Sequence, residues 1–278
     1  MTARLPLGIL AGGGGLPGRV AAAAVAAGRD VFLVGLEGFA DPGVLAPYRH
    51  EFIRIGAAGR ILAALRAYGC RDLVMIGPVR RPSLLDMRPD AEGAVILARI
   101  GRAAFAGDDG LLAAVVKVLS EQGFRVIGAQ EVLTEALAPP GLLSRATPDA
   151  QAMADIVRGI GVVRALGGAD VGQSCVVQQG IVLAVEAVEG TDAMLRRCGD
   201  LARTGPAGVL VKLAKPGQDR RADLPTIGRI TILAAAKAGL RGVAFEAGGT
   251  LLVDRAATIA EADMRGIFML SLDPDHPG

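Results

Sequence analysis

The highest concentration of reactive side chains lies between Val211 and Gly228, where an apolar stretch leads into a loop that carries charges of both signs. Basic side chains in such a loop can neutralise phosphate oxygens, and carboxylates can hold a divalent cation or take a proton from water. The alternative is a solvated loop whose charges only keep the protein soluble. The charged residues are Lys212, Lys215, Asp219, Arg220, Arg221 and Asp223.

Prolines shape this segment. Pro216, which is followed by Gly217, and Pro225 prevent one continuous helix. We therefore expect a strand over 208–213, then a turn, then a helix from Pro225 to about Ala238. The charged side chains would lie on the turn between the strand and the helix.

A second group of polar side chains follows a buried strand predicted at 181–188. This strand would bring Glu186, Glu189, Thr191 and Asp192 close together at its end. Thr191 or Asp192 could instead cap the next helix, and both roles can coexist because a capped helix start exposes amides to a phosphate. With the two aspartates of the first loop, this group forms an acidic cluster beside basic residues. That pattern is typical of metal-assisted phosphoryl chemistry.

Four consecutive glycines, Gly12, Gly13, Gly14 and Gly15, end a predicted strand and precede a predicted helix. Glycines there let the backbone approach a nucleotide phosphate or a sugar, and the helix start favours an anion. The spacing matches neither the dinucleotide fingerprint nor a P-loop. A tight turn without a ligand is the alternative.

Two arginines, Arg80 and Arg81, follow the strand predicted at 72–76. Open α/β sheets bind ligands at the carboxyl ends of their strands, so both could bind phosphate. A solvated turn fixed by its two prolines is the alternative. Asp108 and Asp109 could similarly bind a ligand or cap the helix that follows them.

The order of the predicted elements indicates an α/β fold with two domains. Residues 1–134 alternate strands and helices, which predicts a doubly wound, Rossmann-like parallel sheet. Residues 135–147 contain Pro139-Pro140-Gly141 and are expected to be a linker. Residues 148–278 are predicted to form a second α/β domain with a mixed sheet, which opens with a helix capped by Thr147 and carries the main catalytic motifs.

The composition excludes several classes of protein. A net charge of +2, the absence of Trp and the lack of a basic stripe argue against nucleic-acid binding. Three cysteines without a CxxC pair fit a reducing compartment, and the two histidines, His50 and His276, make a His-based triad a poor expectation. No apolar run approaches the roughly 18 residues of a membrane span, so a cytoplasmic protein is expected.

Five motifs, in order across nearly the whole chain, resemble the LpxI family of UDP-2,3-diacylglucosamine pyrophosphatases. The last two are distinctive, whereas many nucleotide-binding proteins share the glycine turn. The motifs are Gly8-Ile-Leu-Ala-Gly-Gly-Gly-Gly-Leu-Pro17, Arg80-Arg81-Pro82, Gly107-Asp-Asp109, Val185-Glu-Ala-Val-Glu-Gly-Thr-Asp192 and the segment from Lys212 to Gly228.

The resemblance implies hydrolysis of the pyrophosphate of UDP-2,3-diacylglucosamine to UMP and 2,3-diacylglucosamine 1-phosphate in lipid A biosynthesis, with Mg²⁺ or Mn²⁺. It also implies two α/β domains that clasp the substrate, a homodimer, and an essential aspartate that matches Asp223. A lipid-linked UDP-sugar substrate implies transient contact with the inner membrane surface. Gly217 and Arg220 depart slightly from the pattern expected in this motif.

These considerations assign roles to particular residues. We expect Asp223, Asp219 and Lys215 to be catalytic, and Asp223, Asp219 and Glu186 to hold the metal. The expected substrate-binding residues are Gly12, Gly13, Gly14, Gly15, Arg80, Arg81, Glu189, Thr191, Asp192, Lys212, Gln218, Arg221 and Thr226. Two other functions remain alternatives, namely a nucleotide-dependent oxidoreductase and a noncatalytic protein that binds a sugar nucleotide or a lipid.

Overall fold

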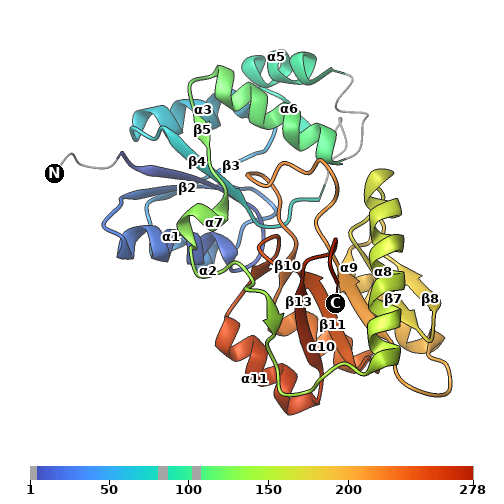
Figure 1. Ribbon diagram of the computed structural model, residues 1–278. Coiled ribbons are helices and arrows are strands. Elements are labelled where there is room, and N and C mark those ends of the chain that lie inside the picture. The colour runs from blue at the N-terminus through green and yellow to red at the C-terminus, as the bar shows by residue number, and fades with distance from the viewer. Residues whose placement is uncertain (1–4, 81–86, 102–107, 278) are drawn as a thin grey trace. The chain divides into compact units, whose positions relative to one another are not determined.

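A computed structural model describes residues 5–80, 87–101 and 108–277 (Figure 1). The chain forms two compact units, one of Met1–Thr134 with Asp219–Asp223 and one of Glu135–Gln218 with Leu224–Gly278. The segment 135–147, which we expected to be a linker, belongs to the second unit. Its residues Gly141–Leu142 form strand β6, which pairs with another strand of that unit.

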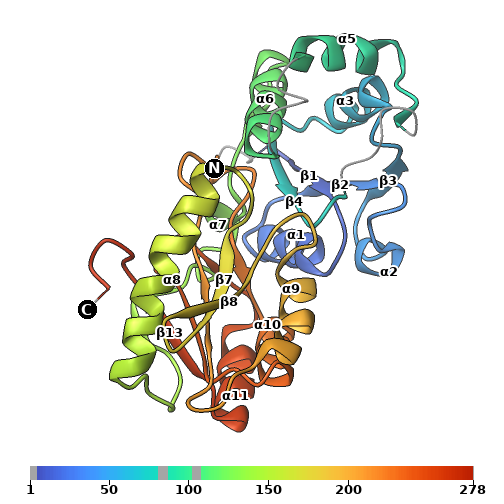
Figure 2. The same ribbon diagram turned by 90° about the vertical axis from the view of Figure 1, so that its right-hand side faces the viewer.

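The first unit is a parallel sheet with helices on both faces, as predicted. Its strand order is β3-β2-β1-β4-β5. Helices α3, α5 and α6 cover one face, and α1, α2 and α7 cover the other (Figures 1 and 2). The strands are β1 (Leu7–Ala11), β2 (Val31–Leu36), β3 (His50–Ile53), β4 (Asp72–Ile76) and β5 (Arg125–Val126), and the helices are α1 (Leu16–Ala26), α2 (Pro42–Leu45), α3 (Ala58–Ala67), α5 (Ala91–Ile100), α6 (Asp108–Glu121) and α7 (Ala129–Val132).

The second unit is built on a mixed sheet, which confirms the predicted class. Its strand order is β6-β13-β11-β9-β7-β8, in which β13, β11 and β9 are parallel and the others antiparallel to their neighbours. A parallel pair, β10 (Thr226–Ile227) and β12 (Leu251–Leu252), lies outside it. The other elements are β7 (Ser174–Gln178), β8 (Ile181–Val185), β9 (Val209–Lys212), β11 (Gly242–Glu246), β13 (Phe268–Leu272), α8 (Ala150–Gly168), α9 (Thr191–Cys198), a 3-10 turn (Gly199–Leu201), α10 (Arg229–Lys237) and α11 (Arg255–Arg265).

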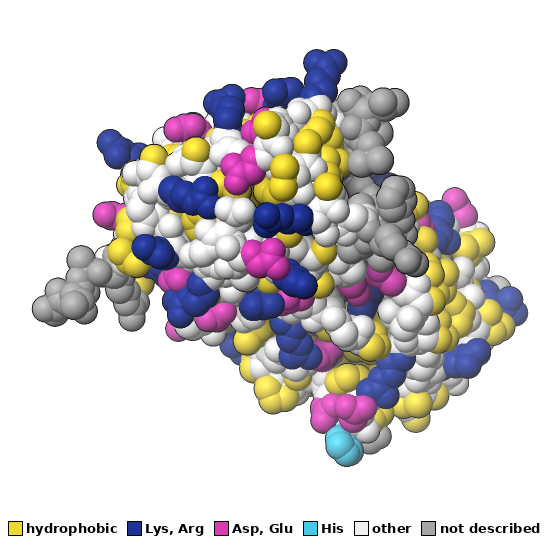
Figure 3. Space-filling model, turned by 90° about the horizontal axis from the view of Figure 1, so that it is seen from above, with side chains coloured by type: hydrophobic (Ala, Val, Ile, Leu, Met, Phe, Trp, Pro, Cys, Tyr) yellow, Lys and Arg dark blue, Asp and Glu magenta, His cyan; other side chains and the backbone are white. Residues whose placement is uncertain are grey.

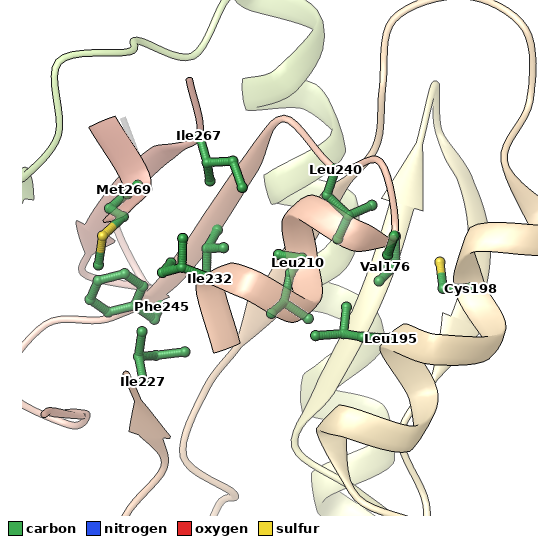
Figure 4. Close-up of a cluster of buried hydrophobic side chains, with 14 of the residues drawn as sticks. Val176, Leu195, Cys198, Leu210, Ile227, Ile232, Leu240, Phe245, Ile267 and Met269 are labelled. Carbon is green, nitrogen blue, oxygen red and sulfur yellow. The ribbon is translucent and has the colours of Figure 1, made fainter. Parts of the chain in front are cut away.

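Side-chain alternation along the strands gives this sheet two apolar faces. Val176 and Leu210 belong to the core that includes α9, α10 and α11, and Val177 and Val211 belong to the core that includes α8. Figure 4 shows the first core, where the Phe245 side chain of β11 lies beside Ile227, Ile232 and Met269. Because both faces are covered, the strand β7 is buried along its whole length. Burying the sheet on both sides leaves only its edges for a ligand.

Two predicted helix starts are wrong. Asp149, not Thr147, caps α8, since its Oδ1 accepts a 2.7 Å hydrogen bond from the Ala152 amide. The chain also does not become helical at Pro225, because it first forms β10 and α10 begins only at Arg229. Strand pairing with β12 overrides the local proline signal there.

In the part of the chain that the structure describes, no helix is both long and apolar enough to cross a membrane. On the face of the molecule seen in Figure 3, Lys and Arg side chains are interspersed with Asp and Glu side chains. All three cysteines are buried. Burial raises the pKa of Cys70 to about 11 and that of Cys175 to about 12, so neither thiol is suited to act as a nucleophile.

Candidate functional site

One edge of the mixed sheet collects polar side chains from three adjacent strands. Lys212 ends β9, and its register partner Ser174 begins the antiparallel strand β7. Glu186 directly follows β8, whose end pairs with the beginning of β7. Because β7 and β8 run in opposite directions, the start of one and the end of the other share the edge at which β9 ends.

The side chains at this edge form a buried hydrogen-bonded network. The Lys212 ammonium donates a 2.9 Å bond to Thr191 Oγ1, and Thr191 Oγ1 donates a 3.0 Å bond to Glu186 Oε1. Ser174 Oγ donates a 2.6 Å bond to Glu186 Oε2. All four residues are at most 8% exposed. The sequence brought Glu186, Thr191 and Lys212 into the candidate site, and the structure places these three in one network.

The loop after β9 is braced by the end of α8. Lys215 Nζ lies 2.5 Å from Asp170 Oδ1, and only 10% of the lysine side chain is exposed. Gln218 closes the loop through two hydrogen bonds to Lys215. Its side-chain Oε1 accepts one from the Lys215 backbone amide, and its backbone amide donates one to the Lys215 carbonyl. These bonds hold Lys215, a predicted catalytic residue, on a shaped turn that begins immediately after the sheet edge.

The next five residues, Asp219–Asp223, belong to the first unit. Asp219 Oδ1 accepts bonds from the Arg221 amide and Nε, and Oδ2 accepts one from the arginine NH2 group at 2.7 Å. Ala222 packs against the core that contains α3 and α6, and the Gln130 side chain donates to the Arg220 carbonyl. The half-buried Asp223 closes the turn, because its amide donates to the Asp219 carbonyl.

The two aspartates of this turn have different surroundings. The hydrogen bond from Arg221 holds the pKa of the Asp219 carboxyl below its usual value and raises the pKa of the guanidinium. A carboxylate with a lowered pKa is a weaker proton acceptor. Asp219 is therefore suited to hold Arg221, and a chemical role for Asp223 stays a prediction.

The four glycines of the first unit divide into two pairs. A Cβ on Gly12 would lie 2.4 Å from the Gly77 carbonyl oxygen, and the Gly13 amide donates to the Pro78 carbonyl. Gly12 and Gly13 thus allow the loops after β1 and β4 to touch. Gly14 and Gly15 are exposed, with no heavy atom within 4 Å of an added Cβ among the described neighbours. Close packing therefore explains Gly12 and Gly13, and ligand binding at Gly14 and Gly15 stays a prediction.

The remaining predicted residues are more scattered. Arg80 is exposed, and Arg81 lies outside the described residues, as does Gly107. Glu189 pairs with Arg197 of α9 at 2.8 Å, and Asp192 is exposed in the first turn of that helix. Thr226 lies in β10 and donates to the Leu224 carbonyl.

The expected metal ligands are not assembled into a protein-only site. Among the described residues, no group of three His, Cys, Asp or Glu side chains could hold an ion. Both Asp219 oxygens accept bonds from Arg221, and both Glu186 oxygens accept hydroxyl bonds. Mg²⁺ is commonly held by one or two carboxylates together with substrate phosphates and water. Asp223 stays the predicted protein ligand in such an arrangement.

Family models match both halves of this chain. The LpxI N-terminal domain matches residues 6–136, and the LpxI C-terminal domain matches residues 139–270. The chain belongs to the LpxI family. It is 47% identical over 276 residues to the UDP-2,3-diacylglucosamine pyrophosphatase LpxI of Caulobacter vibrioides, which covers 97% of this chain and 98% of that protein.

One solved structure with a remote likeness to this LpxI-family chain comes from Bordetella bronchiseptica. The enzyme WbmG of Bordetella bronchiseptica, solved in complex with NAD and UDP, is 12% identical with a TM-score of 0.34. The alignment covers 96% of this chain and 98% of that one. A likeness at this level does not bear on function.

Three side chains at the sheet edge of this LpxI-family chain were missed by sequence reasoning. They are Ser174 beside Glu186, Asp170 beside Lys215, and Glu246, whose Oε2 accepts a 3.1 Å bond from the Ala214 amide. None of them stands beside a charged residue in the sequence. Their proximity depends on the register of β7, β9 and β11, which a single sequence does not reveal.

Proposed function

We propose that this protein hydrolyses the pyrophosphate bond of UDP-2,3-diacylglucosamine, releasing UMP and 2,3-diacylglucosamine 1-phosphate in lipid A biosynthesis. The observation that carries the proposal is the 47% identity, over almost the full length of both chains, to a protein that bears this activity as its name. Matches to both LpxI domain models support it.

The chemistry requires a water oxygen to attack one phosphorus, a P–O bond of the pyrophosphate to break, and a proton to leave the water. Asp223 supplies the carboxylate for this step, either by taking that proton or by holding a divalent ion. Asp219 keeps Arg221 in place, as their hydrogen bonds indicate. When bound, Mg²⁺ or Mn²⁺ would offset phosphate charge and help to ionise water.

The basic side chains of the motif offset the negative charge on the phosphates. Lys212 and Lys215 are fixed at the sheet edge by Thr191 and Asp170. A donor that is already held in place needs little reorganisation when charge develops, which favours transition-state stabilisation. We include Arg221 in the same role.

We further propose that the protein acts in the cytoplasm as a homodimer, with transient contact at the inner membrane surface. The basis for the membrane contact is the substrate in the relative's name, because two acyl chains keep such a molecule at a membrane. The cytoplasmic location and the homodimer rest on the family resemblance. Vesicle flotation with and without substrate lipid would test the contact, and light scattering would test the dimer. Flotation in neither condition would exclude a membrane-associated protein.

The metal requirement is tested by product analysis. Purified protein is incubated with UDP-2,3-diacylglucosamine and Mg²⁺, Mn²⁺ or a chelator, and UMP and the lipid monophosphate are quantified by mass spectrometry. We expect equimolar products with either ion and none with chelator. Equal release in all three conditions would refute metal dependence, and binding without any release would indicate a noncatalytic binding protein.

A further inference from the structure

Within the described part of the chain, the buried Lys212 ammonium donates one hydrogen bond. The residue is 7% exposed, at the last position of β9. Among the described residues, Thr191 Oγ1 is its hydrogen-bond partner, at 2.9 Å. An ammonium has three donors, and a buried charge is costly unless it is compensated. Lys212 is therefore suited to receive an anionic group of a ligand.

Chemistry fixes the direction of every bond in the network. An ammonium can only donate and an ionised carboxylate can only accept, so the Thr191 hydroxyl must accept from Lys212 and donate to Glu186. The Ser174 hydroxyl likewise donates to the second oxygen of Glu186. The carboxylate thus orients the Thr191 hydroxyl so that its lone pair faces the ammonium.

The network also separates the Lys212 ammonium from the Glu186 carboxylate. A direct ion pair would neutralise Lys212, because opposite charges in contact at a poorly solvated position interact strongly. Here a hydroxyl lies between them, and the described residues show no ion pair between Lys212 and Glu186. The lysine is thereby held in place while its charge stays available.

We propose that Glu186 is a positioning residue rather than a metal ligand. Acting through Thr191, and braced by Ser174, it fixes the Lys212 ammonium for a phosphate of the substrate. This inference rests on the proposed function only in taking the ligand to be a pyrophosphate. It reassigns Glu186, because both of its oxygens accept hydroxyl bonds and one of these bonds links it to the Lys212 ammonium through Thr191.

The test is a double-mutant cycle on UMP release from UDP-2,3-diacylglucosamine by the full chain. The variants are Thr191→Val, Thr191→Ser, Lys212→Ala and the Thr191→Val/Lys212→Ala double variant. Thr258→Val is the matched control, because it also removes a fully buried hydroxyl of the same unit, one bonded only to the Val253 carbonyl in the described chain. Melting temperatures are recorded for all of them.

We expect Lys212→Ala to lower kcat/KM about 100-fold and Thr191→Val about 10-fold, as for lost charge-stabilising donors. Thr191→Ser, which keeps the hydroxyl, should remain within about threefold of the wild type. In the Lys212→Ala background, Thr191→Val should add less than about twofold, because coupled residues are not additive. Thr258→Val should lower the melting temperature without changing kcat/KM.

Multiplicative losses in the double variant, or a Thr191→Ser variant as impaired as Thr191→Val, would overturn the positioning role. The Mg²⁺ dependence of Glu186→Gln is a second measurement. If Glu186 is not a metal ligand, this variant should need the same Mg²⁺ concentration for half-maximal activity as the wild type. A large increase in that concentration would restore Glu186 as a metal ligand. If the wild type releases no UMP, the proposed function fails, and UDP binding by calorimetry replaces turnover for the same variants.

Discussion

At the scale of single residues, the structure separates side chains that sequence treated alike. Asp219 and Asp223 are both acidic residues of one motif, and the structure shows that three donors of Arg221 bind Asp219. The residue types favour phosphate chemistry in this loop, and that role stays a prediction. They could not reveal which carboxylate is held by which cation, because that depends on how the turn closes.

The pairing of Asp219 with Arg221 predicts a specific pH behaviour. Asp219 stays ionised below its usual pKa, so its titration should not produce the acidic limb of the pH profile of kcat/KM. We expect Asp219→Asn to lower kcat/KM about 10-fold, by releasing Arg221, while the midpoint of that limb stays unchanged. The measurement is UMP release from pH 4.5 to 9. A midpoint that moves in the variant would show that Asp219 itself titrates in turnover.

At the scale of elements, the sequence predicted more of the helices and strands than it did of the contacts at the candidate site. The alternation of strands and helices predicted the doubly wound first sheet, and the structure confirms it. The boundaries at Thr147 and Pro225 were wrong because Asp149 is the better placed cap and because Pro225 precedes a paired strand. Ser174 and Asp170 could not be found without the register of the mixed sheet.

The glycine turn allows a matched test of its two readings. Gly12→Ala would place a methyl group 2.4 Å from the Gly77 carbonyl oxygen, whereas Gly15→Ala would meet no described atom within 4 Å. We expect Gly12→Ala to reduce the free energy of unfolding by about 1–3 kcal/mol, as overpacking does, and Gly15→Ala to leave it unchanged. Urea unfolding followed by circular dichroism measures both.

Activity of the same pair identifies the ligand-facing part of the turn. If Gly15 approaches the substrate, Gly15→Ala should raise KM at unchanged stability. Wild-type kinetics in Gly15→Ala would reduce the whole motif to a packing turn. Equal stability of the two variants would contradict the close approach of the β1 and β4 loops.

At the scale of the whole molecule, carboxylates paired with arginines should set the acid limit of stability. Asp72 accepts bonds from both Arg125 and Arg29, and the Arg125 bond is the main cause of its lowered pKa. A lowered folded-state pKa gives stability that is complete above the unfolded pKa of about 3.9 and is lost as pH falls through the folded value.

Asp72→Asn should therefore destabilise the protein by about 1–2 kcal/mol at pH 7, a modest value because the Arg125 side chain is 73% exposed. The difference from the wild type should shrink once the pH falls below about 4. Unfolding by urea at pH 7, 5 and 3 checks both statements. If the difference in unfolding free energy between wild type and Asp72→Asn grew as the pH fell, it would have the wrong sign for a lowered pKa of Asp72.

Hydrolysis that depends on Asp223 is tested by following UMP release from UDP-2,3-diacylglucosamine with wild type and with Asp223→Ala, alongside their substrate affinities. Removing a group that acts in proton transfer or metal binding should cost about 10²–10⁴-fold in rate. We predict steady release by the wild type, and for Asp223→Ala a loss of that size with substrate affinity and melting temperature retained. An Asp223→Ala variant as active as the wild type, or a wild type that binds the substrate without releasing UMP, would contradict it.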